Sequence, residues 1–318
     1  MALEQKTVKT AATTLRRRAV DDDVPALVRF LAVIITTLFA FVCIAPLWLT
    51  VSVSFTDEKA LMMNGYNFIP SVFSLKAYSY IFNNAEQIFS SYGVTLASTV
   101  SGVCLGLLIM TLYAYAISRD YFAYKKQFAF LAFFTMLFNG GMLSSYIINT
   151  NVLHLKDTFW ALILPSCIST MYIMVLRSFM STSVPASVVE SAKIDGASEF
   201  RCYWGIVLPM SLPSVATVAL FMTVTFWNAW YSAFLYIVNN KALVPIQLLL
   251  KRIENEIQYL AQASGSLSGS EIAVMQADIP SESVKMALVV IVVIPILVAY
   301  PFFQKYFVKG ITIGAVKE

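Results

Sequence analysis

The sequence has little charge. Of its 318 residues only 13% are Asp, Glu, Lys or Arg, and 58% are hydrophobic. Soluble domains typically carry about 25% charged and about 45–50% apolar residues. So few charges cannot cover a soluble body of this size, which excludes a cytosolic enzyme and a disordered regulator. The net charge of +4 is also too small to indicate nucleic-acid binding.

Common chemical motifs are also missing. The four cysteines form no C-x-x-C pair, so they predict neither a disulfide framework nor a metal site. The single histidine, His154, lies near the outer end of a predicted helix, which favours a plain polar residue over a ligand or a base. The P-loop pattern G-x-x-x-x-G-K-[ST] does not occur. We therefore expect no catalytic residue, no metal and no cofactor on this chain.

Long charge-free stretches are what the sequence has in abundance. About 20 apolar residues in a helix cross the hydrocarbon core, and the alternation expected of membrane β-strands is absent. The third stretch is the weakest, because Asn139-Gly140-Gly141 interrupts its apolar run. The sequence predicts an all-α polytopic membrane protein with six spans, at residues 28–53, 91–118, 126–148, 158–180, 209–238 and 284–306.

Lys and Arg predict the orientation in the cell membrane. With six spans, the side that carries both termini holds 15 of the 22 basic residues, whereas the acidic residues divide evenly. That side is therefore expected to be cytoplasmic, with tails over 1–26 and 307–318 around a membrane domain over 27–306. A chain with only five spans would place its C-terminus outside. The basic run 16–18 could rest on anionic membrane lipid, although a simple topology signal explains it better.

The cytoplasmic segment 183–209, between the fourth and fifth predicted spans, reads as two short helices around one glycine. Pro185 suits a first helical turn, and Gly196 suits a left-handed helix end. A second helix is expected to run from Ala197 towards Trp204. Such a helix–Gly–helix unit can dock into a groove of a partner. On shape alone, an ordinary interfacial connection is equally compatible.

Finer patterns predict how the first of these helices begins and which side it buries. Ser187 and Glu190 have the spacing of a capping box. Val184, Val188 and Ala192 form a narrow apolar stripe at i, i+4 and i+8. We expect this stripe to pack inward.

The spacing of residues in this segment resembles the EAA loop of ABC importer permeases. In that family Glu-Ala-Ala is followed by three residues and Gly, then by nine residues and Ile, then by two residues and Pro. All of these intervals hold here, and Ser191 in place of the first Ala is the one departure. The resemblance implies an ATPase-coupling loop (residues 183–209) whose motif positions are Glu190, Ser191, Ala192, Asp195, Gly196, Ala197, Ile206 and Pro209.

Further segments resemble the carbohydrate-uptake branch, the relatives of the maltose permease. The Asp-Gly-Ala form of the loop and the tail from Gly310 to Lys317 are typical of that branch. Residues 139–142 and 245–252 resemble the subgroup for complex oligosaccharides. The resemblance covers the chain from about residue 25 to its end.

The resemblance implies a set of partners. It implies a second permease subunit, an ATP-binding cassette ATPase dimer and an extracytoplasmic solute-binding protein that delivers an oligosaccharide. ATP and Mg²⁺ would be bound by the ATPase and not by this chain. The outer loops 57–86 and 238–283, the second with helical character over 246–262, are the expected surface for the binding protein.

Aromatic residues of the fifth predicted span are candidates for a sugar pathway, because aromatic faces stack on the apolar surface of sugar rings. Trp227, Asn228, Trp230 and Tyr231 lie close together in sequence. Trp227 and Tyr231 are expected on one helical face at i, i+4. An interfacial aromatic belt is an equally compatible explanation.

Other functions are less compatible with the residues. A permease for another solute, such as a peptide or a polyol, would share most of these features. An ion-coupled carrier usually keeps ionisable residues deep inside its spans, and the interiors of these spans have no Asp, Glu, Lys or Arg. A serine-type membrane protease would need a histidine at depth, whereas His154 is expected near the surface.

Overall fold

The computed structural model describes residues 25–83, 85–264 and 282–314. Over these residues the protein is helical and has no strand, apart from one isolated bridge between Thr56 and Phe73. The prediction of an all-α protein is confirmed for this part of the chain. Residues 1–24 of the predicted N-terminal tail, residues 265–281 of the predicted outer loop and the last four residues lie outside it.

Two long helices coincide with predicted spans. They are α2 (Ala26–Ser54) and α5 (Ala85–Ser118), and both are long and apolar enough to cross a membrane. The corresponding predictions were 28–53 and 91–118. A third long helix, α16 (Glu282–Gly314), covers the predicted span 284–306 and continues beyond it. The tail predicted from residue 307 therefore begins as helix.

The other three predicted spans are bent, and one of the bends lies at Asn139-Gly140-Gly141, where the sequence predicted an interruption. If each bent pair forms one span, the described residues hold five candidates. In the first pair, α6 (Lys125–Leu137) is followed by α7 (Gly141–Ile147) and η1 (Ile148–Val152) at an angle of 114°. In the second, η2 (Phe159–Leu162) and η3 (Leu164–Ser166) are followed by α8 (Thr170–Ser183) at 55°. In the third, α10 (Glu199–Cys202), η4 (Tyr203–Val207) and α11 (Leu208–Met210) are followed by α12 (Leu212–Trp227) at 78°.

Each bend has a local cause. Gly141 has a φ of +80°, and its N–H donates to the side chain of Asn139 at 2.9 Å. Pro165 lies within η3, where its fixed φ and missing N–H disfavour a continuing α-helix. Pro213 lies in the first turn of α12, a position where the absent N–H is harmless. Helix α12 thus starts at Leu212, after the bend, and not at Pro209.

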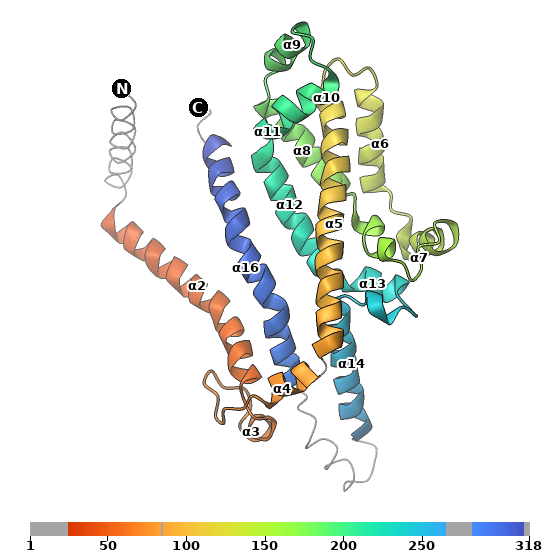
Figure 1. The fold of residues 1–318 in the computed structure, drawn as a ribbon. Helices are drawn as coiled ribbons and strands as arrows, with labels where there is room; N and C mark the ends of the chain where they lie inside the picture. The colour runs from red at the N-terminus through yellow and green to blue at the C-terminus, as the bar shows by residue number, and fades with distance from the viewer. Residues whose placement is uncertain (1–24, 84, 265–281, 315–318) are drawn as a thin grey trace.

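Shorter helices lie at the two ends of the molecule. Figure 1 shows α9 (Ala186–Ile194) and α10 at the same end as the start of α2 and the end of α16. At the opposite end lie α3 (Glu58–Asn64), α4 (Lys76–Asn83) and the end of α14 (Ile246–Ser264). α13 (Trp230–Tyr236) and η5 (Lys241–Leu243) connect α12 to α14. Both chain ends of the described part therefore point the same way.

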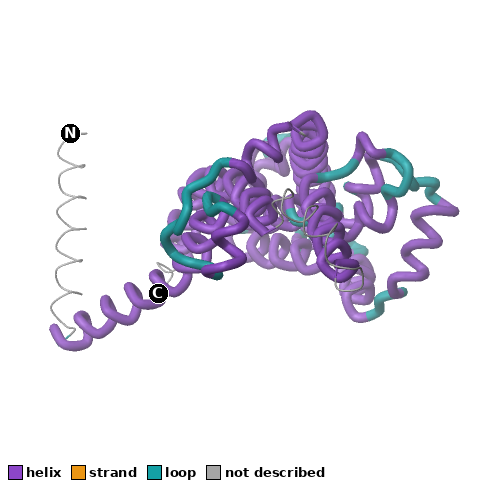
Figure 2. The backbone as a smooth tube through the Cα atoms, turned by 90° about the horizontal axis from the view of Figure 1, so that it is seen from below, coloured by secondary structure: helices purple, strands orange, loops and turns teal. Residues whose placement is uncertain are grey.

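Helix α2 stands apart from the other helices. Seen from below, it leaves the body of the molecule (Figure 2), and it packs chiefly against α16. None of its most apolar 18-residue window is buried. Such a wide apolar surface needs lipid or another subunit to cover it.

Two clusters of buried side chains hold the remaining helices together. One joins α4, α13, α14 and α16 through residues such as Ile81, Tyr236 and Leu288. The predicted outer helix 246–262 is confirmed as α14, with Leu249 buried in this cluster and Ile253 packed against it. The second cluster joins α5, α8, α9 and α12, and it supports the coupling loop.

Helix α5 approaches its neighbours most closely at two glycines. A Cβ on Gly106 would lie 2.4 Å from the carbonyl oxygen of Cys167 and 2.3 Å from the methyl group of Met222. A Cβ on Gly102 would lie 2.5 Å from the ring of Phe226. These glycines have the G-x-x-x-G spacing that permits close helix packing in membranes.

Pro295 interrupts the hydrogen bonds of α16, and two side chains from neighbouring helices compensate. A proline leaves the carbonyl four residues earlier, here that of Ile291, without its helical donor. The Tyr92 hydroxyl on α5 donates to this carbonyl at 2.5 Å. The indole N–H of Trp227 donates to the next carbonyl, that of Val292, at 3.3 Å. The carbonyls next to Pro295 are thus satisfied by side chains of α5 and α12, as expected of proline in a bilayer helix.

Replacing Tyr92 with phenylalanine is expected to destabilise the protein by about 1–3 kcal/mol, because a buried carbonyl loses its donor. The measurement is the thermal unfolding of the purified protein in detergent. In a Pro295→Ala background the alanine N–H can donate to the Ile291 carbonyl. Tyr92→Phe should then destabilise the protein much less. Equal costs in both backgrounds would contradict this account.

Candidate functional site

The first helix of the coupling loop ends at Gly196, as predicted. Gly196 has a φ of +81°. Its N–H donates to the carbonyl of Lys193 at 3.0 Å, and the N–H of Ala197 donates to that of Ala192 at 2.9 Å. This pair of bonds is the Schellman motif, in which the residue after the glycine often also contacts the residue four positions before the glycine. Ala192 and Ala197 accordingly pack against the same buried cluster.

Of two finer predictions about this helix, one was wrong and one holds in part. Pro185 occupies the N-cap position of α9 and no side chain caps the helix, so Ser187 and Glu190 form no capping box. Of the predicted stripe, Val184 is buried and Ala192 packs against the buried cluster, whereas Val188 is 41% exposed. Val189, buried at 1% exposure, takes its place on the inner face.

The inner side of the coupling loop is tied to α5 and α8. Val189, Cys202 and Val207 are buried together with Met180 of α8 and Ile117 of α5. In this way the loop is attached to the spans on both sides of it.

Tyr203 adds a polar tie between the loop and α5. It is 1% exposed, and its hydroxyl lies 2.7 Å from the Thr111 hydroxyl on α5. A displacement of the loop would therefore move the ends of these helices, because packed interiors transmit strain.

Glu199 at the start of α10 gathers three side chains. Its carboxylate accepts hydrogen bonds from the hydroxyls of Tyr115 and Tyr121, each at 2.7 Å, and forms an ion pair with Lys193 of α9. The Lys193 ammonium also lies 3.1 Å from the centre of the Tyr121 ring. Partial burial by itself lowers the pKa of Lys193, but its contacts with Glu199 and Tyr121 raise that pKa above the ordinary value. These contacts hold α9 and α10 in one orientation.

The outer side of the coupling loop is uncovered. Glu190, Ser191, Asp195, Gly196 and Pro209 are exposed, and Ala192, Ala197 and Ile206 are half-buried. Two large apolar side chains stand beside them, Ile194 at 87% and Phe200 at 70% exposure. Exposed apolar side chains rimmed by polar residues mark an interaction surface. The predicted coupling residues thus share one loop with a braced inner side and an open outer side.

The four aromatic-pathway candidates do not share one surface. Helix α12 ends at Trp227, and Ala229 leaves the helical conformation with a ψ of 62° before α13 begins. The predicted i, i+4 face of Trp227 and Tyr231 is therefore wrong. Trp227 is 6% exposed, whereas Trp230 and Tyr231 are 38% and 47% exposed. Asn228 is exposed, and its side-chain oxygen Oδ1 accepts a hydrogen bond from the side-chain amide of Gln247 at 3.0 Å.

A cavity of about 850 Å³ lies between α5, α12 and α16. Tyr92, Thr99, Phe221, Trp227 and Pro295 are among its lining residues. The wall is almost wholly apolar, which makes it a poor site for sugar hydroxyls that need hydrogen-bond partners. Among the described residues no group of three or more His, Cys, Asp or Glu side chains could hold a metal ion.

Comparisons with known proteins agree over nearly the whole chain. Residues 24–313 match the family described as "Binding-protein-dependent transport system inner membrane component". The "Polygalacturonan/rhamnogalacturonan transport system permease protein YtcP" of Bacillus subtilis is 38% identical over 88% of this chain and 94% of its own length. The "Arabinooligosaccharides transport system permease protein AraQ" of Halalkalibacterium halodurans is 27% identical over 87% and 92%.

A solved structure is similar in fold. It is a bacterial ABC transporter "involved in the import of the acidic polysaccharide alginate", and one of its chains matches with a TM-score of 0.75 and 26% identity. The match covers 88% of this chain and 96% of that chain.

Proposed function

The chain belongs to the family of binding-protein-dependent transport system inner membrane components, and we propose that it is the permease subunit of an ABC importer that moves an oligosaccharide into the cell. The 38% identity to a polygalacturonan/rhamnogalacturonan permease, over 94% of that relative, carries this proposal. The alginate importer supports the same substrate class. Both are named for acidic polysaccharides, so oligomers of uronic acids are the first substrates to test.

The coupling loop is proposed to receive the driving force. Its outer side, from Glu190 to Ala197 with Ile206 and Pro209, would dock onto one subunit of a separate ATPase dimer, which binds ATP and Mg²⁺. The inner side is braced by Val189, Glu199 and Tyr203. ATPase movement would then pass through the loop to α5, α8 and α12 as a rigid displacement.

We propose six spans, with α16 as the sixth and both termini in the cytoplasm. The common direction of the start of α2, the end of α16 and the coupling loop (Figure 1) supports an even number of spans. The tails would cover 1–26 and 307–318, and the membrane domain 27–306. The coupling loop 183–209 would lie inside and the loop 238–283 outside.

Further partners follow from the uncovered surfaces. The apolar face of α2 would lie against lipid and a second permease subunit, because none of its most apolar window is buried within this chain. The outer loops 57–86 and 238–283 would receive the solute-binding protein. Asn228, Trp230 and Tyr231 would meet the sugar from the outer half, and Trp227 would act through its contact with α16.

Uptake of a labelled galacturonate oligomer by cells that depend on this permease tests the proposal. We expect uptake to vanish when the partner ATPase is inactivated in its ATP site. A neutral arabino-oligosaccharide serves as the comparison substrate. Transport by this chain alone in liposomes under an ion gradient would contradict the proposal.

A further inference from the structure

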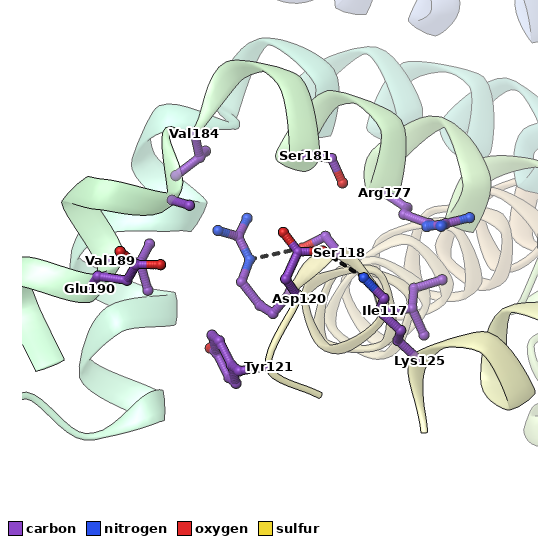
Figure 3. Close-up of a pocket in the computed structure, with 12 residues that line it drawn as sticks. Ile117, Ser118, Asp120, Tyr121, Lys125, Arg177, Ser181, Val184, Val189 and Glu190 are labelled. Atoms are coloured by element: carbon purple, nitrogen blue, oxygen red, sulfur yellow. Dashed lines mark hydrogen bonds and ion pairs between the residues drawn. The ribbon is translucent and has the colours of Figure 1, made fainter. Parts of the chain in front are cut away.

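A cavity of about 410 Å³ lies behind the coupling loop. It is bounded by the end of α5 with the turn after it, by α8 and by α9 (Figure 3). Its polar wall is unusual for the edge of a membrane domain, because it carries several basic side chains and hydroxyl groups. These are Arg119, Lys125, Arg177, Ser118, Ser181 and Tyr121.

Arg119 is a fixed cation in this wall. The residue is 5% exposed. Its Nη2 donates to the Met180 carbonyl at 2.9 Å, and its Nε donates to the Ser118 hydroxyl at 3.0 Å. The guanidinium carbon lies 5.5 Å from the centre of the Tyr115 ring. No carboxylate of the described residues forms an ion pair with Arg119, although a buried charge is costly without a counter-charge.

The remaining charges of the cavity leave a second cation without a counter-charge. Asp120 pairs with Lys125 at 2.5 Å, so these two neutralise one another. Arg177 of α8 is half-buried and forms neither a hydrogen bond nor an ion pair with any described residue. Glu190 also lines the cavity, but Figure 3 places it and Arg177 on opposite sides. Arg119 and Arg177 therefore line a cavity with two carboxylates, Asp120, which is paired with Lys125, and Glu190 on the far side.

We propose that this cavity binds a phosphate group. Guanidinium forks match the oxygens of phosphate in pairs, and the hydroxyls of Ser181 and Tyr121 can supply further donors. The cavity volume lies within the roughly 300–1,000 Å³ typical of small-ligand sites. The group can come from an anionic phospholipid, because basic pockets between helices on the cytoplasmic side suit such headgroups. It can also come from a free phosphate ion.

A phosphate group in this position bridges the elements that the coupling loop must move together. Arg119 follows α5, Arg177 belongs to α8, and Val189 of α9 forms the facing wall. The bound anion thus joins three segments that otherwise meet through Arg119 and the apolar cluster. This site is separate from the proposed sugar pathway, and it shares only Glu190 with the outer side of the coupling loop.

The experiment uses the intact transporter complex and two probes. In detergent, inorganic phosphate is titrated against chloride at equal ionic strength. In lipid nanodiscs, phosphatidylglycerol is compared with phosphatidylcholine, and lipids that stay bound are counted by native mass spectrometry. Arg177→Gln is the test variant. Lys126→Gln is the matched control, because Lys126 is an exposed base near the cavity that does not line it.

We expect Arg177→Gln to weaken binding of the phosphate group at least about tenfold, since a hydrogen bond to a charged group is lost, and Lys126→Gln to change it less than about twofold. The probe that binds more tightly identifies the source. Equal losses in both variants, or no binding of either probe, would overturn the proposal. It would also be overturned if the permease pair bound phosphate only without its ATPase, since the ATPase would then fill the cavity.

Discussion

Gly196→Asp is expected to abolish uptake while the protein stays folded in the membrane. Gly196 has a φ of +81°, and a Cβ at this position would meet no atom within 4 Å. Aspartate is one of the residues that tolerate the left-handed region, so the chain itself should lose only about 1 kcal/mol. At a close contact with the ATPase, however, an unpaired carboxylate costs about 3–5 kcal/mol, which weakens docking by roughly 100-fold or more.

A matched control separates strain from charge. Gly196→Asn should lose less uptake than Gly196→Asp, because asparagine also tolerates the left-handed region and adds no charge. Membrane abundance and co-purification of the ATPase are measured beside uptake. Normal uptake by Gly196→Asp, with the native permease absent, would contradict the coupling role of the loop.

Features that depend on neighbouring residues could be predicted from the sequence. The charge-free runs of the sequence predicted α2 and α5, and its amphipathic pattern predicted α14. The glycine after Asp195 gave the end of α9, because a left-handed residue at that point is a local requirement. The interruption at Asn139-Gly140-Gly141 was also predicted, but hydropathy alone could not give the direction of the chain after a break, and the bends near Pro165 and Ser211 were missed.

Contacts between distant segments could not be predicted. Glu58 of α3 accepts from the backbone and side chain of Ser283 at the start of α16, at 3.0 and 2.7 Å. Asp157 accepts backbone N–H groups from Val238 and Asn239, at 2.7 and 2.8 Å. No spacing rule joins residues this far apart in sequence. The role of Arg119 is equally hidden, because its partner is a backbone carbonyl.

One signal was local and was nevertheless missed, namely the G-x-x-x-G spacing of Gly102 and Gly106 in α5. Gly106→Val is expected to lower the free energy of unfolding by about 3 kcal/mol or more. The added atoms would press on the carbonyl of Cys167, which is backbone and cannot turn away as a side chain can. Overpacking of a core usually costs about 1–3 kcal/mol, and this position belongs at the upper end. The measurement is the membrane abundance and thermal unfolding of the purified protein.

Gly93→Val in the same helix is the matched control. A Cβ on Gly93 would meet no atom within 4 Å, so the same substitution there adds helix propensity without a clash. Similar losses at both positions would mean that valine harms α5 itself and that close packing is not the cause. A loss confined to Gly106 would show that α5 must approach the turn at Cys167, between η3 and α8, this closely. The spans that hold the coupling loop would then depend on a residue with no side chain, far from any partner that the loop binds.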